Sequence, residues 1–225
     1  IFTEEADKKH DKFKIHRHEG VLFYSIFQWI DRKNPQDLIK TYWKTFTGKN
    51  DVTLLLKTYR VNYDIAEFDK IKEDIKTWKN ETPLGHYPRI VLCKKLLTDG
   101  DMFRLHETGD CLVQPDHGEG WSRTVAEAML LGKPVIATAR GGIHEYLNSD
   151  HYFRIPSEYV RVRPQNWIPW YTADMRWAQP DLETLSKSML YVYNNIEIST
   201  AKGLLAQDFI KREFSYHKVG APTLW

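Results

Sequence analysis

The sequence has few cysteines, no long apolar run and almost no net charge, and each absence disfavours a class of protein. Its 225 residues contain two cysteines, too few for the disulfide framework of a small secreted domain. No stretch is long and apolar enough to predict a transmembrane helix. The formal net charge of +2 gives no general electrostatic case for nucleic acid or an anionic membrane as a partner.

The two cysteines, Cys93 and Cys111, each lie in a short apolar run. Because such thiols behave as small hydrophobic groups, we expect both to be buried and free, in a reducing, cytoplasmic compartment. Residues 1–19 are highly charged and lack the apolar core of a signal peptide. We interpret them as a charged tail or linker, and the missing initiator methionine indicates a fragment of a longer protein.

Common motifs for nucleotide binding and nucleophile activation are absent as well. The sequence contains no P-loop and no serine of the nucleophile-elbow type. Gly118, Gly120 and Arg123 match only half of a dinucleotide fingerprint, because the third glycine is missing and the first strand lacks the motif. A dinucleotide-dependent dehydrogenase is therefore disfavoured.

Between residues 20 and 150, five apolar segments alternate with helical patterns, and the links are short. We predict strands at 21–27, 52–56, 89–93, 111–114 and 135–137. We predict helices at 35–46, with Asn34 as its cap, and at 65–78, 98–106 and 121–131. The alternation predicts an α/β fold with a Rossmann-like parallel sheet and helices on both faces.

After residue 150 the alternation stops. The segment 159–177 is rich in aromatic residues, arginine and proline, and we expect an irregular loop or a short strand there. Pro180 is expected to open a helix to about 195, followed by a helix at 198–213. We therefore divide the chain into the tail, a Rossmann-like domain at 20–178, and C-terminal helices at 179–225 packed on it.

The loop after the fourth predicted strand is the most informative segment, because parallel sheets of this kind bind ligands outside the carboxyl ends of their strands. From Asp116 it passes through a glycine-rich turn into a helix. The glycines let the backbone approach a ligand, and the unpaired N–H groups at the start of the helix form an anion site. We expect a diphosphate beside Gly120, Trp121, Ser122 and Arg123.

Two carboxylates, Glu119 and Glu127, lie at the two ends of this segment with seven residues between them. A carboxylate can accept two hydrogen bonds from neighbouring sugar hydroxyls, which suits a ribose diol. Glu127 is flanked by small and apolar residues, which favours a tucked-in side chain over a solvated one.

This segment resembles the donor half of the retaining glycosyltransferases of family four, which have the two-Rossmann-domain architecture called GT-B. The matching residues are at 119–121, 127–129, 132–138 and 141–145, with supporting matches at 23–25, 32–33 and 177–181. The resemblance covers about residues 20–215. It departs at His144, where the family often has proline.

The resemblance implies a nucleotide sugar as donor substrate and a role for each matching residue. Glu127 would hold the ribose, and Glu119 would lie beside the transferred sugar as the catalytic carboxylate. Arg32 and Lys33 would contact the diphosphate, with Lys57 as a weaker phosphate candidate. The implied reaction is a hexosyl transfer with retention that needs no metal or other cofactor, whereas the base, the sugar and the acceptor stay open.

Alternatives from other classes are also open. The domain could hold a nucleotide sugar, or act as a scaffold, without catalysis. Asp116, His117 and Glu119 could be metal ligands, but no second cluster completes a shell. The aromatic and basic run at 161–171 could bind nucleic acid, but the near-zero net charge disfavours it.

The chain accounts for one sheet, whereas GT-B enzymes react in the cleft between two such domains. We therefore expect that an N-terminal acceptor domain is missing and that this chain alone transfers sugar weakly or not at all. We also expect the late helices to expose Tyr191, Tyr193 and Phe209 on their outer face, where a homodimer could form.

Overall fold

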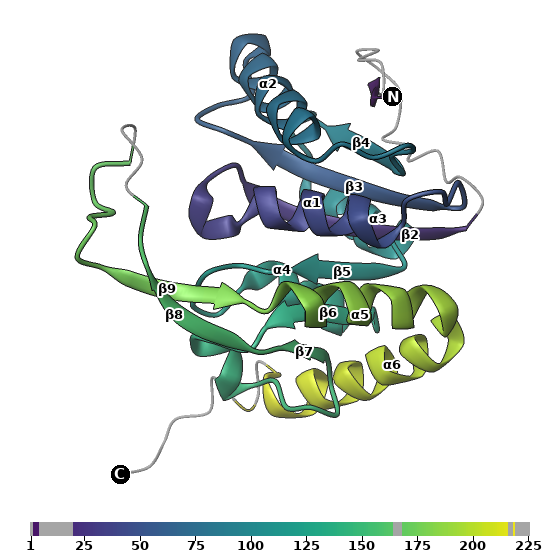
Figure 1. The fold of residues 1–225 in the computed structure, drawn as a ribbon. Helices are drawn as coiled ribbons and strands as arrows, with labels where there is room; N and C mark the ends of the chain where they lie inside the picture. Colours follow the sequence, from purple (N-terminus) through teal and green to yellow (C-terminus); the bar gives the residue numbers. More distant parts are fainter. Residues whose placement is uncertain (1, 5–19, 164–167, 216–217, 219–225) are drawn as a thin grey trace.

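The predicted alternation produces one parallel sheet in the computed structural model of the chain, which describes residues 2–4, 20–163, 168–215 and 218 (Figure 1). The strands of this sheet are β1 (Phe2–Glu4), β2 (Val21–Gln28), β3 (Val52–Tyr59), β4 (Arg89–Cys93), β5 (Cys111–Gln114), β6 (Val135–Thr138) and β7 (Phe153–Ile155). Their spatial order is β1-β4-β3-β2-β5-β6-β7, and each neighbouring pair is parallel. The predicted Rossmann-like α/β fold is confirmed.

Helices cover both faces of the sheet. They are α1 (Pro35–Thr45), α2 (Ile65–Glu81), α3 (Asp99–Thr108), α4 (Arg123–Leu130), α5 (Leu182–Asn194) and α6 (Ile196–Glu213). Phe23 of β2 belongs to a core cluster with residues of α1, α2 and α5. The next residue, Tyr24, belongs to a second cluster with residues of α3, α4 and α6. Because successive strand residues point to opposite faces, an uninterrupted apolar run is what a strand buried on both sides requires.

The strand order places β2 and β5 at the centre of the sheet. From β2 the chain first adds β3 and β4 on one side and then returns to add β5 and β6 on the other. The connections from β2 and β5 therefore diverge, and sheets of this kind bind ligands at the carboxyl ends of the strands where the order reverses.

The structure differs from the sequence predictions between residues 157 and 181. β8 (Ser157–Arg161) and β9 (Arg176–Pro180) form an antiparallel hairpin where a loop or short strand was expected. Most of β8 is partly or fully exposed, so it carries no continuous apolar run. Pro180 ends β9 instead of opening a helix, and Asp181 caps α5 by accepting a hydrogen bond from the amide of Thr184.

The predicted start of α4 and the predicted capping of α1 by the Asn34 side chain differ from the structure, whereas α1 begins at Pro35 as predicted. α4 begins at Arg123, two residues after the predicted start, because Ser122 has a left-handed backbone with φ of 54°. Asn34 has the same φ and does not cap α1 with its side chain. Its amide instead donates to the carbonyl of Pro115, which ties the β2 exit to the β5 exit.

The ends of the chain bring further corrections. Phe2–Glu4, expected in the charged tail, forms β1, whereas residues 5–19 lie outside the described part of the chain. Of the late aromatic residues, Tyr191 is 45% exposed, as expected. Tyr193 is partly buried against the core and bonds to Asp51, and Phe209 stacks on His151. These two side chains therefore do not form an exposed face.

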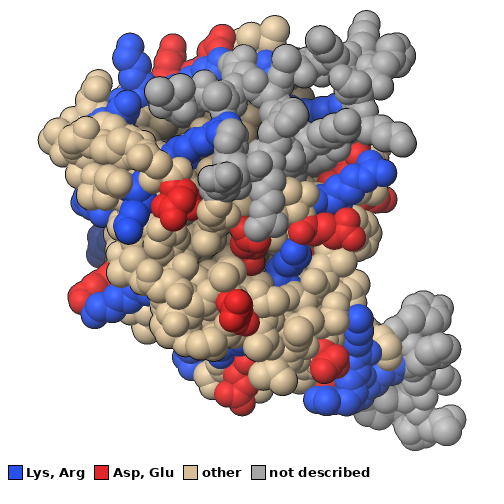
Figure 2. Space-filling view, turned by 90° about the vertical axis from the view of Figure 1, so that its right-hand side faces the viewer, with Lys and Arg blue, Asp and Glu red and all other residues tan. Residues whose placement is uncertain are grey.

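Cys93 and Cys111 are buried free thiols, as predicted. Among the described residues, no helix combines the length and the apolar character that a membrane span needs. On the face drawn in Figure 2, acidic and basic side chains are interspersed over a surface that is mostly uncharged.

Candidate functional site

The exits of β2 and β5 meet at the carboxyl edge of the sheet. β2 leads into a short 3-10 helix, η1 (Asp31–Lys33), which carries Arg32 and Lys33. β5 leads into the glycine-rich loop. The amide of His117 in this loop donates a hydrogen bond of 2.8 Å to the carbonyl of Arg32. The topology thus brings together two loops that are more than 80 positions apart in the sequence.

Two cations and two carboxylates form a cluster between these loops. The ammonium of Lys33 contacts Glu119 directly and lies 3.1 Å from Oδ2 of Asp116. The guanidinium of Arg32 donates to the carbonyl of Gly118 at 2.7 Å and to Oε2 of Glu119 at 3.2 Å. Three of the sequence-predicted residues, Arg32, Lys33 and Glu119, therefore lie together.

Burial acts differently on the two carboxylates. Asp116 is 2% exposed, and loss of hydration raises its pKa to about 6 although the charge of Lys33 opposes this shift. Burial also disfavours ionised Glu119, but the hydrogen bond and charge of Lys33 outweigh it, so the pKa of Glu119 is lowered. Glu119 is thus ionised at neutral pH, and its carboxylate contacts both cations of the cluster.

The backbone beyond Glu119 is open to a ligand. A Cβ atom added to Gly118 or Gly120 would meet no other atom within 4 Å. Among the described residues, no side chain caps the start of α4 at Ser122. The unpaired amides at a helix start, together with the helix dipole, favour an anion there.

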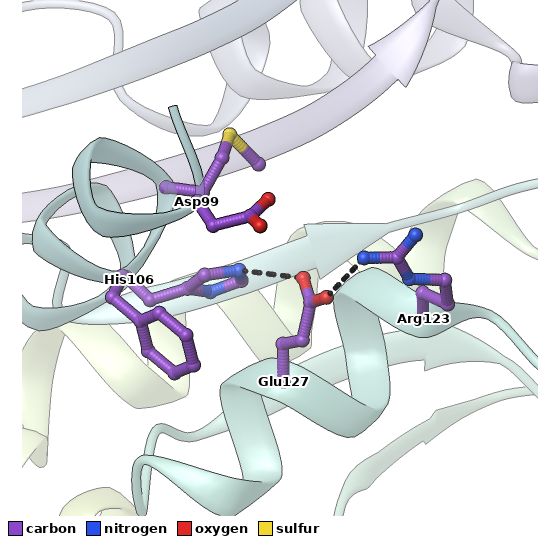
Figure 3. Close-up of a pocket in the computed structure, with 6 residues that line it drawn as sticks. Asp99, His106, Arg123 and Glu127 are labelled. Atoms are coloured by element: carbon purple, nitrogen blue, oxygen red, sulfur yellow. Dashed lines mark hydrogen bonds and ion pairs between the residues drawn. The ribbon is translucent and has the colours of Figure 1, made fainter. Parts of the chain in front are cut away.

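Glu127 lies one turn into α4, at the side of a separate pocket of about 220 Å³ (Figure 3). Its Oε1 accepts a hydrogen bond of 3.1 Å from Arg123, and its Oε2 lies 3.5 Å from Nε2 of His106. The interaction with the nearby His106 side chain is the main cause of the lowered pKa of Glu127. Asp99, Met102 and Phe103 of α3 line the same pocket. Glu127 is therefore an ionised acceptor at a cavity, and not a solvated helix residue.

Two other predicted residues lie in different surroundings. Lys57 is buried within β3, and its ammonium lies 4.6 Å from the centre of the Tyr63 ring. Burial lowers the pKa of Lys57, and the structure does not place it in the cluster of Arg32 and Lys33. The Trp121 ring packs on Tyr146 and Phe214, while the carbonyl of Trp121 accepts from the Tyr146 hydroxyl. Trp121 thus anchors the loop with its side chain.

Sequence reasoning missed two polar residues of these sites. Asp116 was considered only as a metal ligand, although its place two residues after a buried strand is compatible with an inward-facing side chain. His106 was assigned to the end of a helix, and nothing in its local pattern indicates that it faces Glu127 from across the pocket. Trp177 was likewise missed as a partner of the glycine-rich loop: its ring stacks on His117 with centroids 4.4 Å apart.

Among solved structures, the fold matches domains of known glycosyl transferases. The C-terminal domain of a glycosyl transferase group 1 family protein (LpcC) from Francisella tularensis aligns with a TM-score of 0.61 and 15% identity, over 87% of both chains. Alr3699/HepE from Anabaena, solved in complex with UDP and glucose, aligns with a TM-score of 0.61 and 17% identity, over 87% of this chain and 45% of that one. These likenesses show the fold.

Sequence comparison finds curated relatives of much greater length. Sucrose synthase 4 from Oryza sativa subsp. japonica is 31% identical over 156 residues, which are 65% of this chain and 19% of the relative. Sucrose synthase 1 from Hordeum vulgare is 26% identical over 154 residues, with the same coverage. The chain thus spans about a fifth of the length of these relatives. The sequence model of the family described as "Glycosyl transferases group 1" matches residues 20–161, more than half of the chain, and the chain therefore belongs to the group 1 glycosyl transferases.

Proposed function

We propose that this chain binds a nucleoside diphosphate sugar and forms the donor half of a glycosyltransferase that retains the configuration of the transferred sugar. The observation that carries this proposal is the meeting of Arg32 and Lys33 with Glu119 beside the open start of α4. Membership of the group 1 glycosyl transferases and the UDP-glucose named with Alr3699/HepE support it.

In this proposal the diphosphate lies against Arg32, Lys33 and the amides from Gly120 to Arg123. The two cations and the helix start supply positive charge from two directions. Glu119 contacts both cations, so an arriving diphosphate competes with this carboxylate for them. Displacement by the diphosphate frees Glu119 to contact the sugar.

The ribose of the donor is assigned to Glu127, whose carboxylate borders the pocket beside α3. A ribose diol can donate one hydrogen bond to each oxygen of a carboxylate. Arg123 donates to one oxygen of Glu127 and His106 lies 3.5 Å from the other, so the carboxylate is positioned at the pocket. The base then faces the α3 side of the pocket, where Met102 and Phe103 offer apolar surface.

The chemistry follows from this placement. A sugar leaves its diphosphate through an oxocarbenium-like state, and negative charge grows on the departing phosphate. Fixed cations and oriented amides stabilise that charge without a reorganisation of solvent. Arg32, Lys33 and the α4 amides are suited to this task, and we propose that no metal is required. Glu119, beside the sugar, stabilises positive charge on the ring.

The acceptor is assigned to a second domain. The described residues form a single parallel sheet and a hairpin, with the proposed donor site at its open carboxyl edge. A facing domain would exclude water and align an acceptor with the sugar. We therefore propose a hexosyl transfer that depends on such a domain, in the cytoplasm.

The test is a calorimetric titration of the chain with UDP-glucose, GDP-mannose and ADP-glucose, followed by an assay for release of free sugar from the donor that binds. We expect one donor to bind and to be hydrolysed slowly. The Glu119→Gln variant should keep binding and lose hydrolysis. Failure of all three donors to bind would end the proposal, whereas binding without hydrolysis would favour a non-catalytic binding module.

A further inference from the structure

His106 is a buried imidazole between two groups that lie on different elements. The residue belongs to α3 and is 0% exposed. Nδ1 lies 2.9 Å from the hydroxyl of Tyr24 on β2, and the two rings meet edge to face. Nε2 lies 3.5 Å from Oε2 of Glu127 on α4 and makes no hydrogen bond among the described residues. One nitrogen is thus fixed, and the other points into the pocket.

Tyr24 decides which nitrogen of His106 carries the proton. Burial raises the pKa of Tyr24 well above its ordinary value, and the nearby Asp110 and Glu127 act in the same direction. The phenol therefore stays protonated, and its O–H group can donate a hydrogen bond to Nδ1. A neutral imidazole has one donor and one acceptor nitrogen, so an Nδ1 that accepts leaves the N–H on Nε2. That N–H is directed at Glu127.

The charged groups around the pocket are consistent with this arrangement. Glu127 and Arg123 line the pocket from α4, with Glu127 between Arg123 and His106, and Asp99 lines the pocket from α3 itself (Figure 3). The side chain of Arg123 is 83% exposed, so its hold on Glu127 is screened by water and costs side-chain entropy. The His106 side chain is 1% exposed. Of the two groups that hold Glu127, the imidazole is the one that the fold keeps in place.

We propose that Tyr24 and His106 form a relay that presents an Nε2–H donor to Glu127 and fixes its carboxylate for the ribose of the donor. His106 is a positioning residue, because it acts on the ligand through Glu127. The observed 3.5 Å separation shortens when the site is filled, as polar contacts in ligand-free sites often do. This inference rests on the proposed role of Glu127 in nucleotide binding.

The first experiment determines which ring nitrogen of His106 carries the proton. Long-range nitrogen–proton correlation spectra of the intact chain at pH 8 distinguish the two neutral tautomers of each histidine. We expect His106 to carry its proton on Nε2. In Tyr24→Phe, which keeps the ring and removes only the hydroxyl, the share of the Nδ1–H form should rise. A wild-type His106 protonated on Nδ1 would overturn the relay.

The second experiment measures binding of UDP and uridine by calorimetry. His106→Leu should weaken both ligands by the same factor, about tenfold, because a hydrogen bond to a charged group is lost next to the ribose. His106→Gln, which restores a donor, should recover part of the loss. His86→Leu is the control, since His86 lies on a distant loop, where it accepts from the amide of Gly48.

The outcomes separate this inference from the proposed function. A wild-type chain that binds no nucleotide contradicts the proposed function itself. A folded His106→Leu variant with unchanged affinity for UDP and uridine contradicts the inference alone. If His106→Leu does not fold, the relay is still tested by the tautomer of His106 in the wild-type chain and by the uridine affinity of Tyr24→Phe. Unchanged uridine affinity in Tyr24→Phe, together with an unchanged tautomer, would likewise contradict the relay.

Discussion

The amide of Gly142 donates a hydrogen bond of 3.1 Å to the carbonyl of Glu119, so the loop after β6 supports the loop after β5 where the proposed catalytic carboxylate lies. The neighbouring Gly141 adopts φ 85° and ψ −161°, a region that is essentially restricted to glycine. A Cβ atom at Gly141 would lie 2.2 Å from the same carbonyl. The loop of Glu119 therefore depends on a glycine in another loop.

Gly141→Ala is expected to destabilise the chain and to displace Glu119. Gly48→Ala is the control, because Gly48 also has a positive φ of 79° but a Cβ atom added there would meet no other atom within 4 Å. In the control, backbone strain alone should lower the free energy of unfolding by about 1–2 kcal/mol. Gly141→Ala should lower the free energy of unfolding, measured in urea, clearly more than the control does. It should also weaken UDP binding. An equal loss of unfolding free energy in the two variants would show that the loop at Glu119 moves aside for the added methyl group without an energetic penalty.

Glu127→Ala is expected to weaken nucleotide binding by about 1.5–3 kcal/mol, the range for hydrogen bonds to a charged group. The loss should be similar for UDP and uridine, because the ribose is common to both. Glu183→Ala on α5 is a suitable control, since Glu183 is an exposed residue whose partner is Lys187. Calorimetric titration gives the comparison, and an affinity equal to that of the wild type would remove Glu127 from the site.

Arg32→Gln and Lys33→Gln are expected to weaken UDP much more than uridine, because only UDP carries the diphosphate. The ratio of the two affinities is the quantity to measure, since Lys33 also neutralises the buried Asp116 and its loss will reduce stability. Lys40→Gln on α1, whose partner is Glu81, controls for the loss of one charge. An equal loss of affinity for UDP and uridine would mean that the loop of Arg32 and Lys33 supports the site structurally and does not contact the diphosphate.

Asp116 should make stability depend on pH. Its pKa is about 6 in the folded chain, above the ordinary value, so the folded state holds a proton that the unfolded state has already released. The free energy of unfolding of the wild type relative to Asp116→Asn should therefore fall as pH rises from about 4 to about 6. With ~1.4 kcal/mol for each pKa unit, the fall should not exceed ~3 kcal/mol. Urea unfolding across this range tests the sign, and a rise would show that the Lys33 ion pair dominates.

Removal of metal ions is expected to leave UDP binding unchanged, because two cations and the α4 amides are proposed to hold the diphosphate. Within the part of the chain that the structure describes, no three His, Cys, Asp or Glu side chains are grouped as a metal site. Titrations after dialysis against EDTA, with and without added Mg²⁺, provide the measurement. Binding that required the ion would favour coordination by Asp116 and Glu119.

The regular elements of the sheet were predictable because their signals are local. β2 to β6 are apolar runs that both faces of a covered sheet require, and their predicted bounds agree with the structure to within three residues. The hairpin of β8 and β9 was not predictable in the same way. Most of its residues are partly or fully exposed and pair across the hairpin, so their pattern depends on the partner strand.

The sequence by itself determined that Arg32, Lys33 and Glu119 follow strands of one parallel sheet, because such strands end at a common edge. Only the tertiary structure decided which of them meet. The order β3-β2-β5 placed Lys33 between Asp116 and Glu119 and left Lys57 beside Tyr63. The direction of each side chain, and the packing of α3 against α4 that faces His106 toward Glu127, are set by long-range contacts that no local pattern encodes.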